Sequence, residues 1–398
     1  MRVWIENPFD TLPFEGGRPQ RYYLMSEAFA RAGHRVVCWT ADFNHMLKRR
    51  RVFDAAVLEK LPFAVETVPT RPYSRNVGLA RVLSHRAYAR EWGRLAEAYA
   101  KWHGRPDVIV ISTPPLSTGD VAIRLARKFG AKLVVDVMDA WPQTFYRLLP
   151  FGFRWLKGVL FSSARAAARR QLRSADLVTG VAERYGRLAR AAGASRFHLA
   201  YHGIDLAAAP LPAARSAASA ALRLAYVGSM GRTYDLETVV ETVARMPEVK
   251  LTLAGGGEKR PELERLASEL GCASRVRFLG YLDEVGLTSL LSESDVGVVP
   301  MDADSFVGVP YKFGDYSRAG LAIVSSLAGE SAAMLQRYGA GLRYLGGNAD
   351  DLVSALRRLR PRLDAARSAS RRMAEEEFDA EKIYSEYVRT VERLREEG

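Results

Sequence analysis

The stretch VPYKFGDYSRAGLAIVSS, residues 309–326, decides the fold class of this 398-residue chain. Pro310 suits the first position of a helix, where its missing N–H costs nothing. Lys312 falls in the first turn and Asp315 lies three residues later, near the same face. Gly320 then ends the helix before an apolar run that is typical of a buried strand. The segment predicts a helix that leads into a strand of an α/β sheet.

The same segment has the layout of an anion site. The N–H groups of the first turn and the positive end of the helix dipole can hold a phosphate. Lys312 adds a full charge there, and Asp315 can accept hydrogen bonds from a ribose diol. The alternative is a surface helix with an i,i+3 Lys–Asp pair, and the segment alone does not choose between the two.

Outside this segment, short apolar strands alternate with amphipathic helices in both halves of the chain. The first half has predicted strands at 2–6, 35–40, 107–112, 133–137 and 177–179 and a helix at 21–32. The second half has predicted strands at 222–227, 249–254, 276–279 and 295–300 and helices at 236–246, 261–270 and 284–292. Such alternation indicates mostly parallel sheets covered on both faces. We therefore expect an α/β protein of two doubly wound, Rossmann-like domains that bind ligands in the cleft between them.

The segment LAAAPLPAARSAASAA, residues 206–221, interrupts this alternation. It is rich in small residues, contains proline and is poor in large apolar side chains, which is typical of a linker. We expect an N-terminal domain at 1–205 and a second Rossmann-like domain at 222–375. The remaining residues, 376–398, are expected to form a C-terminal helix that packs back on the N-terminal domain.

The excess positive charge belongs to the first half. Residues 1–205 carry 33 Lys and Arg against 17 Asp and Glu, a net +16, whereas residues 206–398 carry 25 against 28, a net −3. One-sided charge indicates an anionic partner, such as membrane phospholipid, a phosphorylated acceptor or nucleic acid.

The stretch 140–175 contains no acidic residue and mixes arginines with aromatic and aliphatic side chains. A basic amphipathic helix of this kind suits an anionic membrane surface, and its alternative is an ordinary helix with a solvated arginine face. Candidates for contact with an acceptor or a membrane are His45, Arg154, Lys157, Arg165 and Arg169.

The composition limits the other classes of function. Cys38 and Cys272 are far apart and follow no metal-ligand spacing, so we expect no metal site and a reducing, cytoplasmic environment. No apolar run is long enough to span a bilayer, and the chain opens with MRVWIE, which is unlike a signal peptide.

Glycine loops follow three of the predicted strands. They contain Gly16 and Gly17, then Gly228 with Ser229, then Gly255. Glycine lets the backbone approach a phosphate or a sugar closely. None of the three loops matches the dinucleotide or P-loop fingerprints.

Together these motifs resemble the retaining glycosyltransferases of family 4, which have the GT-B fold. LRLAYVGSMG resembles the strand and glycine loop that open the donor domain, and VKLTLAGGGE resembles the next strand. The run 309–326 resembles the family's donor motif, and DVMDAWP, residues 136–142, resembles a segment of the branch that builds surface polysaccharides and O-antigens. The resemblance implies a metal-independent transfer from a nucleotide-sugar, with UDP favoured, to a glycan or polyprenyl-linked acceptor. It also implies a protein at the inner face of the membrane, with no cofactor.

The resemblance assigns roles to individual residues. Lys312 and Arg232 are expected to stabilise the leaving diphosphate. Asp139 is expected to face the acceptor or the donor sugar, where it could act as a base, and its alternative role is to cap the turn after its strand. The expected donor-binding residues are Gly16, Gly17, Gly228, Ser229, Gly255, Gly308, Val309, Tyr311, Lys312 and Asp315.

The sequence also departs from the family pattern. Val307 stands where an acid that holds the donor sugar is usual, Ser229 replaces an arginine, and Met138 replaces a histidine. Two alternatives therefore stay open: a GT-B enzyme of another outcome, such as an epimerase or phosphorylase, and a membrane or nucleic-acid binding protein with a vestigial GT-B fold.

Overall fold

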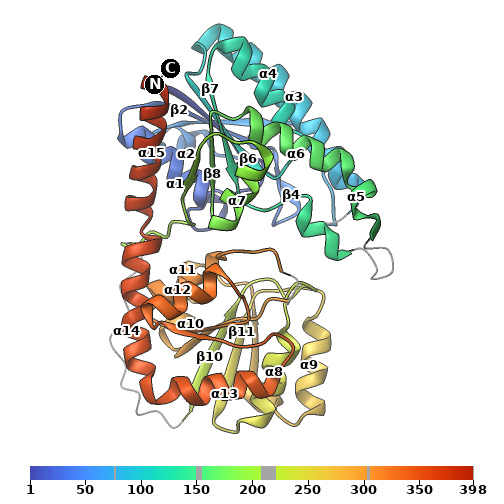
Figure 1. Ribbon diagram of the computed structural model, residues 1–398, viewed down its shortest axis with the longest axis vertical. Helices are drawn as coiled ribbons and strands as arrows, with labels where there is room; N and C mark the ends of the chain where they lie inside the picture. Colours follow the sequence, from blue (N-terminus) through green and yellow to red (C-terminus); the bar gives the residue numbers. More distant parts are fainter. Residues whose placement is uncertain (76–77, 149–154, 208–220, 303–304, 398) are drawn as a thin grey trace. The chain divides into compact units, whose positions relative to one another are not determined.

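The computed structural model describes residues 1–75, 78–148, 155–207, 221–302 and 305–397. The chain forms two compact units (Figure 1). The first comprises residues 1–203 together with 381–398, and the second comprises residues 204–380. The predicted linker, 206–221, lies mostly outside the described residues.

The first unit is built on a seven-stranded parallel sheet with the order β5-β2-β1-β6-β7-β8-β9. Its strands are β1 (Arg2–Glu6), β2 (Arg35–Ala41), β5 (Ala64–Val68), β6 (Val108–Thr113), β7 (Lys132–Val137), β8 (Leu177–Gly180) and β9 (Phe197–Leu199). The central strands are apolar and almost wholly buried because helices cover both faces. A separate hairpin pairs β3 (Phe43–Asn44) with β4 (Arg49–Arg50).

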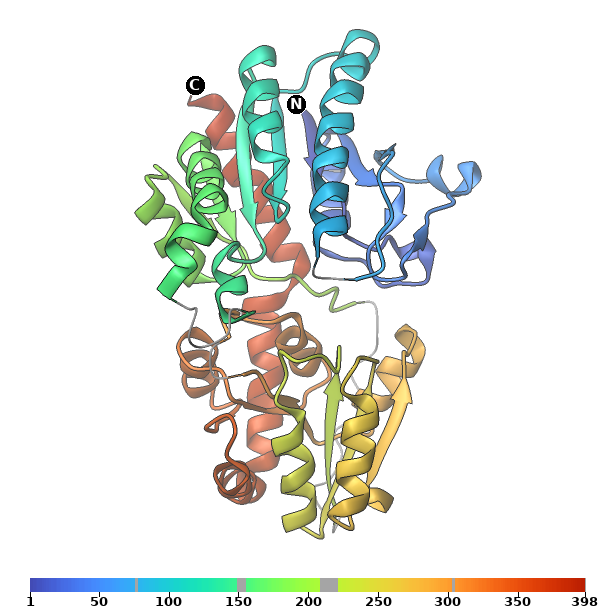
Figure 2. The same cartoon turned by 90° about the vertical axis from the view of Figure 1, so that its right-hand side faces the viewer.

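The helices of this unit lie on the two faces of the sheet (Figure 2). They are α1 (Arg21–Arg31), α2 (Ala55–Leu58), α3 (Leu79–His103), α4 (Gly119–Phe129), α5 (Lys157–Leu160), α6 (Ser162–Ser174), α7 (Glu183–Ala192) and α15 (Ala380–Glu396), with 3-10 turns η1 (Pro13–Glu15) and η2 (Gln143–Leu148). Helices α3, α4 and α6 pack side by side, and α15 packs beside α1 through the rings of Phe29 and Tyr387. His34 and Glu392 lie 2.9 Å apart, so the C-terminal helix is anchored along its length. The two termini consequently lie at the same end of the unit (Figure 1).

The second unit has a six-stranded parallel sheet with the order β12-β11-β10-β13-β14-β15. Its strands are β10 (Leu222–Val227), β11 (Val249–Ala254), β12 (Val276–Gly280), β13 (Val296–Val299), β14 (Ala322–Ser325) and β15 (Gly341–Arg343). Its helices are α8 (Leu236–Arg245), α9 (Arg260–Glu269), α10 (Glu284–Ser292), α11 (Tyr311–Arg318), α12 (Glu330–Tyr338), α13 (Ala349–Leu359) and α14 (Leu363–Met373), with short turns η4 (Ala273–Arg275), η5 (Arg360–Arg362) and the π-helical η6 (Ala374–Phe378). A continuous core of buried side chains joins the sheet to α8, α9 and α13.

The prediction of two doubly wound parallel sheets is confirmed. Gly320, with φ +65°, ends α11 as expected. Pro310 differs from the prediction: its ψ of 154° is extended, so it caps α11 and Tyr311 is the first helical residue. The sequence also missed β5, β9 and β15, since each lies at or beside a sheet edge and lacks a long apolar run.

Candidate functional site

Two glycine loops meet backbone to backbone in the second unit. They follow β10 and β11, which are neighbours in the parallel sheet, so their loops emerge at the same edge. A Cβ atom on Gly255 would lie 2.0 Å from the carbonyl oxygen of Gly228, and one on Gly257 would lie 2.5 Å from the backbone of Met230. Met230 N also donates to Gly256 O at 2.8 Å. Glycine is required here because no side chain fits between the loops.

Lys312 extends from the first turn of α11 toward this glycine platform. A Cβ atom on Gly228 would lie 3.1 Å from Lys312 Nζ. The Nζ also lies 4.2 Å and 4.4 Å from the ring centroids of Tyr226 and Tyr234, within cation–π range. The side chain is 7% exposed, and its Nζ has no hydrogen-bond partner in the described part of the chain.

Burial lowers the pKa of Lys312 to about 7, and the nearby Asp315 carboxylate opposes part of that shift. Asp315 is itself 4% exposed and belongs to the same face of α11. A buried ammonium held by two aromatic rings lacks a hydrogen-bonding anion, which a bound phosphate would supply. The predicted pair of Lys312 and Asp315 is thus buried beside a glycine loop and is not a solvated surface pair.

Tyr316 holds α11 in this position. Its hydroxyl accepts a hydrogen bond from Val227 N at 3.0 Å and donates to Val298 O at 3.3 Å. Gly297 makes room for the ring, since a Cβ atom there would lie 2.3 Å from it. The helix start is therefore tied to the ends of both β10 and β13.

The residues before α11 form a buried lead-in to the helix. Gly308 and Val309 are buried, and the Gly308 carbonyl accepts a hydrogen bond from the Ser331 hydroxyl. Val307 is half-buried and aliphatic, so the structure puts no carboxylate at that position. Tyr311, the remaining predicted donor-binding residue here, is half-buried at the helix start.

Arg232 does not share the buried surroundings of Lys312. Its side chain is 85% exposed and pairs with Glu258 at 3.3 Å. Ser229 is also exposed, and its carbonyl accepts a hydrogen bond from the buried hydroxyl of Tyr226. The role predicted for Arg232 at the diphosphate stays a prediction.

The first unit positions Asp139 just after β7. Both of its carboxylate oxygens accept hydrogen bonds, from Trp141 Nε1 at 3.2 Å and from Thr144 Oγ1 at 2.7 Å. Both donors are side chains of the segment that follows β7, so Asp139 ties that segment together, and the capping of the backbone that the sequence offered as the alternative stays a prediction. Asp139 also lines a cavity of about 210 Å³ with Arg165 and Arg169 of α6, so the aspartate predicted for catalysis and two arginines predicted to contact an acceptor or a membrane lie around one cavity.

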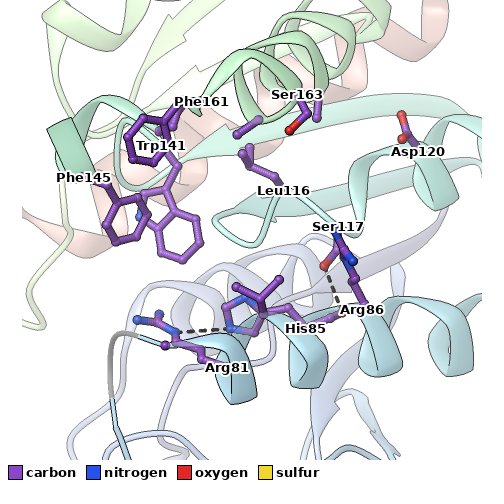
Figure 3. Close-up of a pocket in the computed structure, with 15 residues that line it drawn as sticks. Arg81, His85, Arg86, Leu116, Ser117, Asp120, Trp141, Phe145, Phe161 and Ser163 are labelled. Atoms are coloured by element: carbon purple, nitrogen blue, oxygen red, sulfur yellow. Dashed lines mark hydrogen bonds between the residues drawn. The ribbon is translucent and has the colours of Figure 1, made fainter. Parts of the chain in front are cut away.

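A larger cavity of about 640 Å³ shares Trp141 and Pro142 with the first one (Figure 3). Its lining comes from α3, the start of α4, the segment after β7 and the α5–α6 region, and consists of Gly78, Arg81, Val82, His85, Arg86, Leu116, Ser117, Asp120, Trp141, Pro142, Phe145, Phe161, Ser163, Ala164 and Ala167. Sequence reasoning missed this cavity, because its residues come from segments dozens of positions apart.

The other predicted residues of the first unit are more scattered. Gly16, with φ +86°, ends η1. Gly17 follows it, and a Cβ atom on Gly17 would lie 3.1 Å from the Thr11 methyl group. His45 Nδ1 lies 2.6 Å from the Tyr73 hydroxyl, and burial lowers the pKa of His45 to about 3. Lys157 is exposed on α5, and Arg154 lies outside the described residues.

The described residues contain neither a candidate membrane span nor a candidate metal site. No helix there is long and apolar enough to cross a membrane. No group of three or more His, Cys, Asp and Glu side chains in the described ranges is placed to hold a metal ion.

Comparison with known proteins agrees with this geometry. The family described as "Glycosyl transferases group 1" matches residues 221–360, and the "Glycosyl transferase 4-like domain" matches residues 16–204. The lipopolysaccharide core biosynthesis glycosyltransferase LpsE of Rhizobium meliloti is 48% identical over 61 residues, 15% of this chain. The matches with the curated relatives span only 18% to 29% of those relatives' length.

Two solved structures share the fold along the whole chain. Sucrose-phosphate synthase from Thermosynechococcus elongatus has a TM-score of 0.77 at 17% identity and covers 100% of both chains. HepE of Anabaena, in complex with UDP, has a TM-score of 0.70 at 15% identity and covers 99% of this chain and 100% of that one. At such identities the likeness concerns the fold, and the predicted GT-B class is confirmed.

Proposed function

Because the chain belongs to the group 1 glycosyltransferases of family 4, we propose that it transfers a sugar, with retention, from a UDP-sugar to a glycan or lipid-linked acceptor in bacterial surface-polysaccharide synthesis. The buried, unbonded Nζ of Lys312 beside the Gly228 loop is the observation that carries this proposal. UDP is favoured because HepE of Anabaena binds it on the same fold, and the acceptor class follows the lipopolysaccharide core enzyme LpsE.

The chemistry needs charge stabilisation more than reactive side chains. As the bond between the anomeric carbon and the diphosphate breaks, negative charge grows on the departing oxygens. A cation already aimed there and shielded from water stabilises that charge without reorganisation, and losing one such donor typically costs about 10²–10³ in rate. Lys312 and the first-turn amides of α11 would act in this way, while Asp315 would hold the ribose hydroxyls.

The acceptor's hydroxyl oxygen forms the new bond to the anomeric carbon, and its proton passes to the departing phosphate. Asp139 is the other candidate for that proton. Because both of its oxygens already accept hydrogen bonds from Trp141 and Thr144, we assign Asp139 to positioning that segment.

A nucleotide titration tests the donor site. Calorimetry should detect binding of UDP to the protein, and binding should be lost in Lys312→Ala and weakened in Asp315→Ala. Lys250→Ala, an exposed lysine on β11, is the matched control and should bind as the parent does. No affinity of the parent for UDP, GDP or their sugars would refute the proposal. Conversion of the donor without transfer would favour the epimerase alternative.

The first unit supports a peripheral position at the inner face of the membrane. Its α5 exposes Val159 at 74% and Leu160 at 57%, with Trp155 at 77% just before it, beside the exposed cations of α5 and α6. Apolar side chains next to arginines suit an anionic lipid surface. Binding to anionic liposomes should fall steeply with salt and in a Lys157→Gln, Arg165→Gln variant, and binding indifferent to both would contradict this placement.

A further inference from the structure

The 640 Å³ cavity of the first unit is apolar along most of its wall. Trp141, Phe145 and Phe161 gather at one end and Asp120 lies at the other, with Leu116 between them (Figure 3). Its volume falls in the range of pockets that take small organic ligands, roughly 300–1,000 Å³. A wall of aromatic and aliphatic side chains favours a hydrocarbon over a hydrated ligand.

Several polar groups of the lining already have hydrogen-bond partners. The Ser117 hydroxyl donates to His85 O at 2.9 Å, and Arg81 Nε donates to His85 Nε2 at 3.3 Å. Asp120 accepts from Arg170 at 2.8 Å. A sugar ring would need such groups for its hydroxyls, so the cavity is poorly equipped for a glycan.

Arg81 brings a positive charge to the Trp141 end of the cavity. The guanidinium of Arg81 lies 5.1 Å from the Trp141 ring centroid and 5.6 Å from that of Phe9. Burial lowers the pKa of Arg81, and its interactions with the Tyr73 hydroxyl and the Asp139 carboxylate oppose that shift. A bound anion would stabilise this desolvated charge further. Arg86 is a second, exposed cation of the lining, but it lies beside Ser117 and away from Trp141 (Figure 3), and His85 stays neutral because burial lowers its pKa to about 3. This end of the cavity therefore favours an anion.

Exposed apolar side chains continue from the lining to the surface. Val82 lines the cavity and is 45% exposed, while Leu79 and Leu83 on the same turn of α3 are 72% and 41% exposed. Leu160, beside the lining residue Phe161, is 57% exposed. An apolar rim of this kind gives a chain a path from a lipid phase into the cavity.

We propose that this cavity binds the hydrocarbon chain of an amphipathic anion, with Arg81 holding the anionic group, and that this amphiphile is the sugar acceptor. That the amphiphile is the sugar acceptor rests on the proposed function, whereas the binding of an amphiphile in this cavity does not. The shared chemistry is an alkyl or isoprenyl chain on a phosphate, whether from a membrane lipid or from a dedicated carrier.

The test uses monomeric alkyl phosphates on the full chain. Butyl, hexyl and octyl phosphate are titrated by calorimetry, with octanol and inorganic phosphate as the two halves of the ligand. Each methylene should tighten binding about four-fold, the factor expected when one buried CH₂ contributes about 0.8 kcal/mol. Equal affinity for octyl phosphate and inorganic phosphate would overturn the proposal, since it would leave only an anion site.

Matched variants locate the binding. Ala167→Phe fills the cavity and should abolish octyl phosphate binding, whereas Ala166→Phe, exposed on the same helix, should not. Ala164→Phe repeats the test from one turn away if the first variant does not fold. Arg81→Gln should weaken octyl phosphate about 10- to 100-fold, the range for a charge-assisted hydrogen bond, and leave octanol unchanged. The same loss in Ala166→Phe as in Ala167→Phe would overturn the assignment.

Two further arms separate this inference from the proposed function. UDP binding at the second unit should survive in every cavity variant, so its absence from the parent would count against the donor site alone. Vesicles with and without a polyisoprenyl phosphate, offered as acceptor with UDP-sugars, distinguish the two sources of the chain. Sugar transfer that is undiminished in a folded Ala167→Phe would overturn the acceptor clause.

Discussion

Nucleotide affinity should depend on pH through Lys312. The ordinary pKa of a lysine is 10.5, and burial lowers that of Lys312 to about 7, a difference that corresponds to roughly 5 kcal/mol against the charged form. A diphosphate bound at Nζ favours the charged form. The anion therefore binds the protonated lysine and raises its pKa.

The direction of the effect follows from this. Above pH 7 the ligand-free protein holds Lys312 neutral, so binding must take up a proton and affinity falls as pH rises. One pH unit above 7 costs about ten-fold in affinity until the pKa of the complex is reached. Below pH 7 the lysine is already charged and this dependence disappears. Since the second pKa of a phosphate is about 6, UDP itself changes little above pH 7.5.

Calorimetry at pH 7.5 and 8.5 measures this dependence. We expect UDP to bind about ten-fold more weakly at pH 8.5, with uptake of nearly one proton per nucleotide seen as a dependence on buffer ionisation enthalpy. Lys312→Arg, whose charge does not titrate in this range, should bind with the same affinity at both pH values. Equal affinity of the parent at the two pH values, or an equal slope in the arginine variant, would refute the reasoning.

The ligand-free protein should show the same linkage in its stability. The unfolded chain keeps this lysine protonated up to about pH 10.5, so it binds more protons than the folded chain between pH 7 and 10.5. The free energy of unfolding should therefore rise with pH in that window by about 1.4 kcal/mol per unit from this group. Lys312→Met should lack that rise and should gain most over the parent below pH 7, as measured by urea unfolding.

Three other predictions concern packing and positioning. Gly255→Ala should lower the free energy of unfolding by about 2–4 kcal/mol, because its Cβ would lie 2.0 Å from a carbonyl oxygen. Gly271→Ala is the control: it has open space around it and should cost only about 1 kcal/mol, from its positive φ. Equal costs of the two variants in urea unfolding would contradict the packing argument. Tyr316→Phe should cost about 1–3 kcal/mol, because it leaves Val227 N without its partner, and UDP affinity should fall with it; an unchanged unfolding curve would count against that bond. If Asp139 positions the segment that contains Thr144, Asp139→Asn should lower kcat and leave both the UDP affinity and the pH–rate profile unaltered. Loss of the acidic limb from the pH–rate profile would instead identify Asp139 as the base.

Much of the fold was predictable because its signals are local. Strand–helix alternation, glycine after strands, and proline and lysine at a helix start depend on neighbours within one or two turns. The helix start was misplaced by one residue at Pro310, since a proline fits both the cap and the first turn and only the backbone angles distinguish them.

The site was only partly predictable. Lys312 and Asp315 were found from their spacing. Tyr226 and Tyr234, which flank the lysine, were not found, because a tyrosine in a strand or in the loop after it is equally typical of an ordinary core. Asp139 and Arg232 were chosen from motif positions, and only the structure shows that Asp139 accepts a hydrogen bond from Thr144 and that Arg232 pairs with Glu258.

The sequence by itself determined the α/β fold class, the placement of charge in the first half and the spacing of Lys312 and Asp315, because each follows from composition or from spacing along the chain, whereas the class of enzyme came from the resemblance of its motifs to a family. Only the tertiary structure decided that Lys312 is buried between two rings, and that α3, Leu116, Trp141 and α6 enclose an apolar cavity. Burial and cavities arise where segments that are distant in sequence pack together, so they depend on contacts between segments and cannot be predicted from any one segment alone.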